Sequence, residues 1–166
     1  MVKIAVAIYS TYGHIAKLAE SEIAGLKEAG AEVEYFQLPT SESNDASAKL
    51  SIPVLTPEKL VEFDGVLFGL PTRYGTHPAS FKEFFDASGA QWSTGAFSGK
   101  YAGFFISTGS QGGGQESLIR NSVTVLVHHG IIFVPLGYKE VFPQLTNLEE
   151  VHGGSPWGAG TFAGPD

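Results

Sequence analysis

The sequence predicts an α/β fold in which a doubly wound parallel sheet of five strands is covered by helices on both faces. Apolar runs that suit buried parallel strands alternate along the chain with stretches of helical periodicity. Three of the apolar runs end in loops that are rich in glycine and small polar residues. Because 166 residues suit one core, we expect a single domain spanning 1–166, with its functional loops at the carboxyl ends of the strands.

The strands are predicted from hydrophobicity and from the residues that end each run. The first run is interrupted only by Lys3, and the third ends at Pro71, which cannot continue a ladder of hydrogen bonds. The second alternates between polar and apolar residues, as a strand at the edge of a sheet does. The five predicted strands are 2–8, 32–38, 63–70, 101–107 and 131–135.

Helices are predicted between these strands from apolar residues that recur with the helical period. The stripe that begins at Ile15 ends before Gly30, which suits a helix C-terminus. Two further helices are expected at 79–87 and 115–129, and the polar segment 39–58 reads as a long loop. Residues 153–166 are rich in glycine, so the C-terminal helix that would complete one face of such a sheet is expected to be missing.

Composition narrows the class of partner. Ten basic and seventeen acidic residues give a net charge of −7, which argues against nucleic acid or an anionic membrane as the main partner. The chain has no cysteine, so disulfides and thiol chemistry are excluded. No apolar run has the length of a membrane span, and the first residues read as a strand, so we expect a cytoplasmic protein with no integral membrane segment.

The loop at 9–15 carries the strongest functional signal that composition and spacing provide. It joins a buried strand to a helix through Ser10, Thr11 and Gly13. The free N–H groups and the positive end of the helix dipole at such a turn attract an anion. The loop contains no lysine or arginine, so it suits the phosphate monoester of a bound cofactor better than a triphosphate.

Other nucleotide and metal motifs are absent from the sequence. The first strand–helix turn is not G-x-G-x-x-G, and no G-x-x-x-x-G-K-[ST] or H-E-x-x-H stretch occurs. His128 and His129 are adjacent, so on a helix their side chains diverge by about 100° and do not face one metal ion. We therefore predict no metal site, and a mononucleotide remains as the ligand of the first loop.

Three motifs in the correct order resemble the WrbA family of flavodoxin-like NAD(P)H:quinone oxidoreductases, in a form that looks fungal. They are Tyr-Ser-Thr-Tyr-Gly-His-Ile at 9–15, Phe-Gly-Leu-Pro-Thr-Arg-Tyr-Gly at 68–75 and Ser-Thr-Gly-Ser-Gln-Gly-Gly-Gly-Gln-Glu at 107–116. Val-Pro-Leu-Gly-Tyr at 134–138 and Val-His-Gly-Gly-Ser-Pro-Trp-Gly-Ala at 151–159 extend the similarity. It covers essentially the whole chain and implies a flavodoxin-like sheet with strand order 2-1-3-4-5.

The resemblance implies that the chain binds FMN and uses NADPH or NADH as co-substrate. The first motif would hold the phosphate, the second would face the isoalloxazine ring, and the third would form another wall. The implied cofactor-binding residues are Ser10, Thr11, Tyr12, Gly13, His14, Ile15, Pro71, Thr72, Arg73, Tyr74, Gly75, Ser107, Thr108, Gly109, Ser110, Gln111, Gly112 and His128. Tyr12 and Trp92 are implied to contact substrate, Trp92 often from a neighbouring subunit of a homotetramer.

Several of these residues have a simpler structural interpretation. Arg73 could form a surface ion pair, His128 could be favoured by the end of a helix, and Trp92 could pack in a subunit interface. Near the flavin ring, by contrast, the cation of Arg73 would favour two-electron chemistry. Ser110-Gln111 also stands where the family more often has Gly-Thr, which could alter one wall of the site.

The predicted function is FMN-dependent two-electron reduction of quinones by NAD(P)H, with an antioxidant or detoxifying role. The flavin carries the chemistry, so no protein residue is assigned as catalytic. The partners expected are small quinones and further copies of the chain, as a dimer of dimers. Two alternatives stay open: a one-electron carrier of the flavodoxin type, and a non-enzymatic stress or interaction protein that has lost its flavin.

Overall fold

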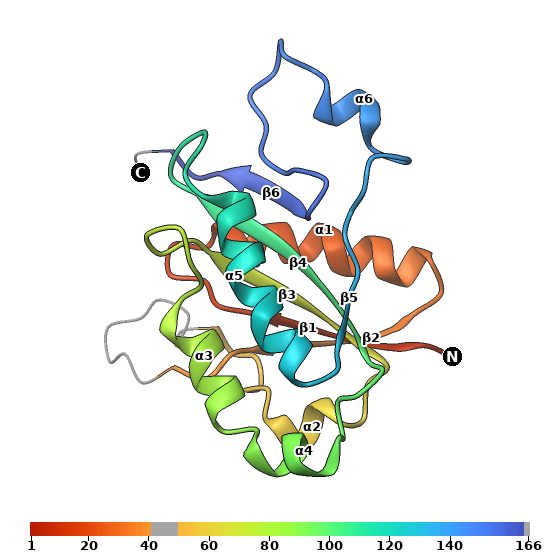
Figure 1. Ribbon diagram of the computed structural model, residues 1–166. Coiled ribbons are helices and arrows are strands. Elements are labelled where there is room, and N and C mark those ends of the chain that lie inside the picture. The colour runs from red at the N-terminus through yellow and green to blue at the C-terminus, as the bar shows by residue number, and fades with distance from the viewer. Residues whose placement is uncertain (41–49, 165–166) are drawn as a thin grey trace.

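The computed structural model describes residues 1–40 and 50–164 and confirms the predicted flavodoxin-like α/β fold. Figure 1 shows α3 and α5 in front of a parallel sheet and α1 behind it. The elements, in chain order, are β1 Lys3–Ile8, α1 His14–Glu28, β2 Glu32–Gln37, α2 Pro57–Leu60, β3 Gly65–Pro71, α3 Ala79–Asp86, α4 Gly89–Thr94, β4 Tyr101–Thr108, α5 Gln115–His128, β5 Ile132–Phe133, α6 Phe142–Leu145 and β6 Ala159–Phe162.

The strand order is β2-β1-β3-β4-β5, as predicted. All pairs are parallel, and β1 lies between β2 and β3 with Ile4 opposite both Val33 and Gly65. In β1 the side chains alternate between two cores, because successive residues of a strand point to opposite faces. Val6 and Ile8 pack beneath α1. Ala5 and Ala7 belong to the larger core on the α3 and α5 side.

The fifth position in the sheet is shared by two short strands, where the sequence predicted one strand over 131–135. β5 has only two residues and pairs with the first part of β4, whereas β6 pairs with the last part, Phe105–Thr108. Between them the chain leaves the sheet over residues 134–158 and includes α6 (Figure 1). Gly158 permits the return, because a Cβ atom there would lie 2.4 Å from the carbonyl oxygen of Phe104.

The glycine-rich segment 153–166 therefore contributes a strand, and three short helices join those predicted. The predicted helices at 79–87 and 115–129 are present as α3 and α5 with nearly the same ends. Within the predicted loop at 39–58, residues 41–49 lie outside the described residues, and the last two begin α2. Trp92 lies in α4, a helix that was not predicted because this segment has no helical periodicity of apolar residues.

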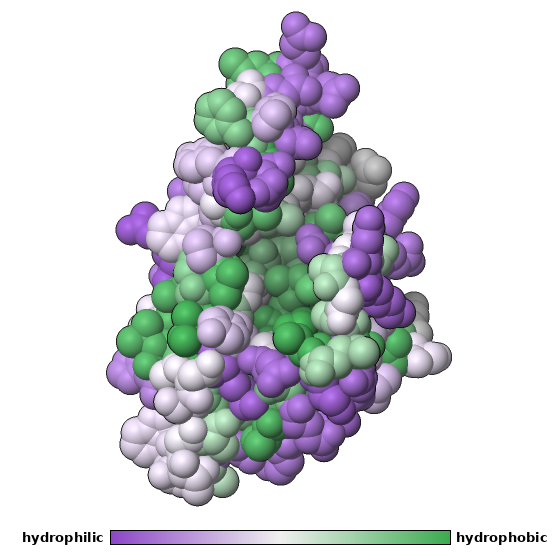
Figure 2. Space-filling model, turned by 90° about the vertical axis from the view of Figure 1, so that its right-hand side faces the viewer, coloured by the Kyte–Doolittle hydropathy of each residue, from purple (hydrophilic) through white to green (hydrophobic). Residues whose placement is uncertain are grey.

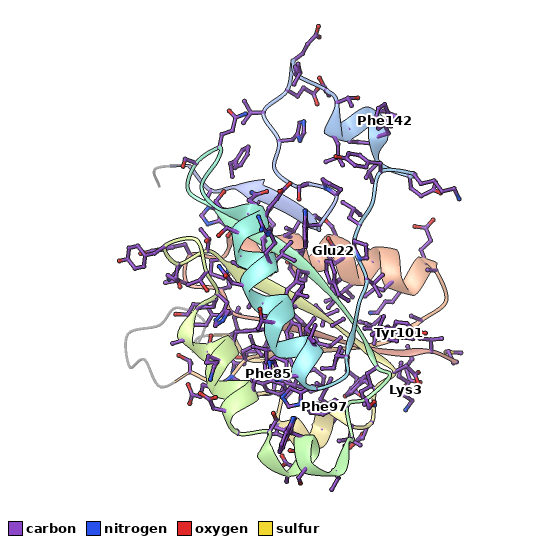
Figure 3. The ribbon with its side chains drawn as sticks, in the orientation of Figure 1. Lys3, Glu22, Phe85, Phe97, Tyr101 and Phe142 are labelled. Atoms are coloured by element: carbon purple, nitrogen blue, oxygen red, sulfur yellow. The ribbon has the colours of Figure 1, made fainter. Side chains whose placement is uncertain are left out.

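An apolar groove opens on the α1 side of the sheet. It has a volume of about 320 Å³ and lies between α1, the beginnings of β3 and β4, and residues 134–136. Figure 2 shows the face that lies on the right in Figure 1, with a hollow lined by hydrophobic residues. Glu22 projects from α1 toward the groove (Figure 3), and burial raises the pKa of its carboxyl.

Within the described ranges no helix is long and apolar enough to cross a membrane.

Candidate functional site

Three loops meet at the carboxyl ends of β1, β3 and β4 and enclose a cavity of about 170 Å³. We call them loop A (9–15), loop B (71–77) and loop C (107–115), and the space between them the loop cavity. Eleven of the predicted cofactor-binding residues line it. They are Ser10, Thr11, Tyr12, His14, Ile15, Pro71, Thr72, Arg73, Ser107, Thr108 and Gly109.

Loop A turns sharply from β1 into the N-terminus of α1. The backbone N–H of Tyr9 donates to the carbonyl of Gly69 at 3.0 Å, which holds the start of the loop against β3. The buried Ser10 hydroxyl accepts a hydrogen bond from the N–H of Ala16 at 3.3 Å. Gly13 precedes the helix with a φ of 91°, a conformation that glycine adopts without strain. The first turn of α1 consequently opens toward the cavity.

Arg73 ties loop B to loop A. Its guanidinium donates to Thr11 Oγ1 at 2.9 Å and to the carbonyl of Thr72 at 3.1 Å. It also lies over the ring of Tyr9, 5.7 Å from the ring centroid. Among the lining residues Arg73 carries the one permanent charge, so the cavity is a mostly neutral site with a single cation at its wall.

Loop B also carries a polar atom that no part of the described chain satisfies. The hydroxyl oxygen of Thr72 is buried and has no hydrogen-bond partner there, although buried polar groups are normally paired. The backbone N–H of the same residue donates to the carbonyl of Ser107 at 2.9 Å, which joins loop B to loop C. This orphaned hydroxyl belongs to a residue that lines the loop cavity.

The tip of loop B is a tight turn that projects beyond the cavity. Arg73 and Thr76 exchange two backbone hydrogen bonds, at 2.8 and 3.0 Å. The two residues between them both have positive φ, 55° for Tyr74 and 82° for Gly75. Both were predicted to bind the cofactor, but neither lines the loop cavity, and the Tyr74 side chain is fully exposed.

Loop C divides between two cavities. Ser107 and Thr108 are buried in the loop cavity at the end of β4, and the Thr108 hydroxyl donates to the carbonyl of Ser110 at 2.9 Å. Gln111 and Gly112 instead line a neighbouring cavity of about 540 Å³ beneath residues 145–155. The residue type at 111 therefore shapes this second space rather than the loop cavity itself.

His152 borders the second cavity and is held by two backbone carbonyls. Its Nδ1 lies 3.1 Å from the carbonyl of Gly153, and its Nε2 lies 2.8 Å from that of Asn147. Both oxygens are acceptors, so only the doubly protonated ring donates to both. The bonds to Gly153 and then Asn147 therefore raise the pKa of His152, and Glu150 adds to the rise.

Two further residues that line the loop cavity, Ala163 and Gly164, were not predicted from the sequence. They follow β6, and the N–H of Ala163 donates to the carbonyl of Thr108 at 2.8 Å. Gln115 secures this arrangement, because its amide nitrogen donates to Thr108 Oγ1 at 3.2 Å and to the carbonyl of Thr161 at 3.0 Å. The glycine-rich character of this segment was a signal of close approach, but its partner strand was not recognisable.

The structure does not bring Trp92 or His128 to the loop cavity. Both lie near the far end of α5, which at 14 residues is about 21 Å long. The Trp92 indole donates to the carbonyl of His128 at 3.1 Å, and the Trp92 side chain is largely exposed. These two residues therefore form a separate surface at the opposite end of the domain.

The described residues contain no group of three or more His, Asp or Glu side chains placed to hold a metal ion.

A parallel sheet of this order, with three loops around a mostly neutral cavity at its carboxyl edge, defines a flavodoxin-like mononucleotide-binding protein.

Comparison with known proteins confirms this class and the predicted family resemblance. The family described as NADPH-dependent FMN reductase matches residues 5–139, and the chain belongs to it. By that membership the protein is an NAD(P)H-dependent flavin oxidoreductase.

Fungal relatives match over nearly the whole chain. It is 55% identical over 170 residues to NAD(P)H quinone oxidoreductase PST3 of Candida albicans, an alignment that covers 99% of this chain and 85% of the relative. It is 54% identical over 172 residues to minor allergen Alt a 7 of Alternaria alternata, covering 99% and 84%. Among solved structures, a flavodoxin described as a WrbA-like protein from Agrobacterium tumefaciens aligns with a TM-score of 0.61 at 28% identity, covering 83% of this chain and 80% of that one.

Proposed function

We propose that the loop cavity binds FMN and that the protein uses NAD(P)H to reduce quinones by two electrons. The observation that carries this proposal is the meeting of loops A, B and C around one cavity with neutral donors and a single cation. The relative from Candida albicans is named as a quinone oxidoreductase, which supports quinones as the substrate class.

The residues at the cavity fit the phosphate monoester of FMN. Ser10, Thr11 and the N-terminus of α1 offer hydroxyl and backbone donors without a lysine or arginine in loop A. A helix N-terminus of this kind stabilises a negative charge through its free N–H groups and its dipole. The buried hydroxyl of Thr72, a residue that lines the cavity, also has no hydrogen-bond partner within the described residues. We infer that the cofactor supplies this partner.

When bound, FMN supplies the hydride and electron chemistry that amino-acid side chains lack. NAD(P)H gives up two electrons and a proton as a hydride, and the quinone takes up two electrons and two protons, the second proton coming from solvent. The chain's own contribution is to bind and orient. Arg73, fixed by Thr11 and by the Thr72 carbonyl, places a permanent positive charge at the wall of the cavity, where added negative charge is stabilised.

Both substrates are proposed to use the same exposed side of the site. Tyr12 and Tyr74 project from loops A and B with exposed rings, and such rings can cover a flat substrate. Since one position cannot hold both substrates together, we expect ping-pong kinetics. Initial rates measured at several quinone concentrations should give parallel double-reciprocal lines.

The protein is further proposed to act as a homotetramer in the cytoplasm. Trp92, Val127 and His128 form an exposed surface at the far end of α5. Since these residues do not reach the loop cavity of their own chain, a contribution from Trp92 or His128 to a flavin site would come from a neighbouring copy. Sedimentation with and without FMN measures the assembly.

The proposed function is tested by adding FMN to the flavin-free protein and following flavin absorbance, then benzoquinone-dependent NADPH oxidation. We expect a yellow complex and turnover that requires all three components. A protein that binds FMN but reduces quinone no faster than free FMN does would contradict the enzymatic proposal, and would return the one-electron carrier as the better interpretation.

A further inference from the structure

The tip of loop B holds a non-glycine residue in a conformation that costs energy. Tyr74 has a φ of 55°, and it is the one non-glycine residue with positive φ in the described part of the chain. Left-handed backbone brings the Cβ atom close to the following carbonyl, and a bulky side chain gains nothing local in return. Such a conformation persists only where the surroundings enforce it.

Two side chains of α5 enforce this turn from outside the loop. The carbonyl oxygen of Gly75 accepts a hydrogen bond from the hydroxyl of Ser117 at 2.7 Å and another from the side-chain amide of Asn121 at 3.2 Å. The two residues are four positions apart, so they lie on one face of the helix, one turn from each other. Both lone pairs of a single carbonyl are thereby occupied.

The start of α5 leaves space for this contact. Gly114, which immediately precedes the helix, lies so close that a Cβ atom on it would be 3.0 Å from Gly75 Cα. A Cβ atom on Gly75 would in turn lie 3.3 Å from the hydroxyl oxygen of Ser117. The turn of loop B therefore rests directly on the helix, with glycine on both sides of the contact.

We infer that Ser117 and Asn121 are positioning residues that fix the Tyr74–Gly75 turn of loop B, and thereby the placement of residues 71–73, the part of loop B that lines the loop cavity, before the cofactor arrives. This inference rests on the proposed function, because it concerns the wall that FMN would meet. Neither residue lines the loop cavity, so both act through loop B. Loop B then needs no reordering on binding, and a preorganised wall strengthens binding by reducing that cost.

The residue types support this assignment. Ser117 and Asn121 occupy exposed helical positions, where alanine would favour the helix more than either of them does. Their presence is therefore not explained by the stability of α5. Their bonds to Gly75 are the contacts that distinguish them from other exposed polar residues of this helix, such as Thr124.

The first test needs no cofactor. In flavin-free protein we compare hydrogen exchange at the Thr76 amide, which bonds the carbonyl of Arg73 across the turn, in the parent and in Ser117→Ala/Asn121→Ala. Exchange in the double variant should be about tenfold faster, because two hydrogen bonds that oppose opening of the turn are lost. The melting temperature should not fall, because alanine favours the helix. Unchanged exchange overturns the inference.

The second test measures FMN affinity in the same proteins, with Thr124→Ala as a matched control on the same helix. The double variant should bind FMN about tenfold more weakly, and the control should bind as the parent does. Ser117→Thr, which keeps the hydroxyl, should bind more tightly than Ser117→Ala. Failure of the parent to bind FMN overturns the proposed function, whereas equal binding by parent and double variant overturns the positioning role alone.

Discussion

Two regions of the domain, the aromatic core and loops A, B and C, differ in how their side chains are packed. In the aromatic core, Phe68 is fully buried and its ring lies 5.1 Å from Phe81 and 5.7 Å from Phe104. Figure 3 shows Phe85 and Phe97 in the same region, beneath the last turns of α5. Loops A, B and C, by contrast, carry exposed tyrosines, a strained turn and a buried hydroxyl that has no hydrogen-bond partner within the described residues.

The same strands carry residues of the aromatic core and of the loop cavity, so the two regions differ although they share a backbone. β3 places Phe68 in the aromatic core and, three residues later, Pro71 at the loop cavity. Dense packing on the α3 side fixes the strand, and this rigidity lets the loops hold unfavourable geometry without unfolding. We therefore expect substitutions in the aromatic core to change stability, and substitutions in loops A, B and C to change binding.

The largest expected effect is at the centre of the aromatic core. Phe68→Ala should lower the free energy of unfolding by about 3–5 kcal/mol, because the cavity left among four rings cannot fully collapse. Tyr12→Ala, an aromatic substitution in loop A, should change it by about 0.5 kcal/mol or less. Urea denaturation measures both values, and similar losses would remove the contrast between the aromatic core and the loops.

The next largest effect is expected at the loop cavity, where a substitution should change binding rather than stability. Arg73→Ala should weaken FMN binding by about tenfold to a hundredfold, because a donor at the cavity wall and the link between loops A and B are both lost. Arg120→Ala, an exposed arginine of α5, is the matched control and should bind normally. Fluorescence titration measures the affinity, and equal affinity for both variants would show that Arg73 is only a surface link.

A smaller effect is expected from relieving the strain in loop B. Tyr74→Asn should raise the free energy of unfolding by about 0.5–1 kcal/mol, because asparagine tolerates left-handed backbone better than tyrosine does. Tyr74→Ala, which keeps the Cβ penalty, should give no such gain. If both variants are destabilised in thermal melts, the turn is not strained in the way its φ angle indicates.

The smallest expected effects are on the pH dependence of stability, to which His129 and His152 contribute in opposite directions. His129 lies between Phe85 and Phe97, and burial, followed by repulsion from His128, lowers its pKa. Its neutral form therefore supports the fold, and this support is lost as the pH falls. The pKa of His152 is raised, so the stability from its two carbonyl bonds is present at low pH and is lost as the pH rises.

Histidine ring signals followed by NMR between pH 4.5 and 8.5, a span about two units on either side of the ordinary histidine value, give the two pKa values. We expect His152 to titrate above the ordinary value and His129 below it. If His129 had the higher pKa of the two, then either burial would not lower the pKa of His129 or the carbonyl bonds would not raise that of His152.

Much of the sheet and of the loop cavity could be predicted from the sequence, because strands buried on both faces are recognisable as apolar runs. Predicted segments 2–8 and 101–107 differ from β1 and β4 by a single residue each. The places of loops A and C followed from where those strands end, and the residues in them that line the cavity were implied by the family resemblance. The turn of loop B at Tyr74 did not, because a positive φ outside glycine is imposed by distant contacts such as those from Ser117.

The fifth position in the sheet could not be predicted from apolar runs. β5 and β6 fill one position in the sheet although residues 134–158 separate them in sequence. β6 contains two small residues and lacks the apolar run that revealed the other strands. It is recognisable only through its pairing with β4, a tertiary contact. Ala163 and Gly164, which follow it, were missed for the same reason.

Whether the loop cavity is a phosphate-anchored FMN site is measured by titrating the flavin-free protein with FMN and with riboflavin, which lacks the phosphate. FMN is expected to bind at one per chain and about a hundredfold more tightly than riboflavin, because loop A and the N-terminus of α1 recognise the phosphate. Equal affinity for the two flavins, or binding of neither, would contradict this expectation.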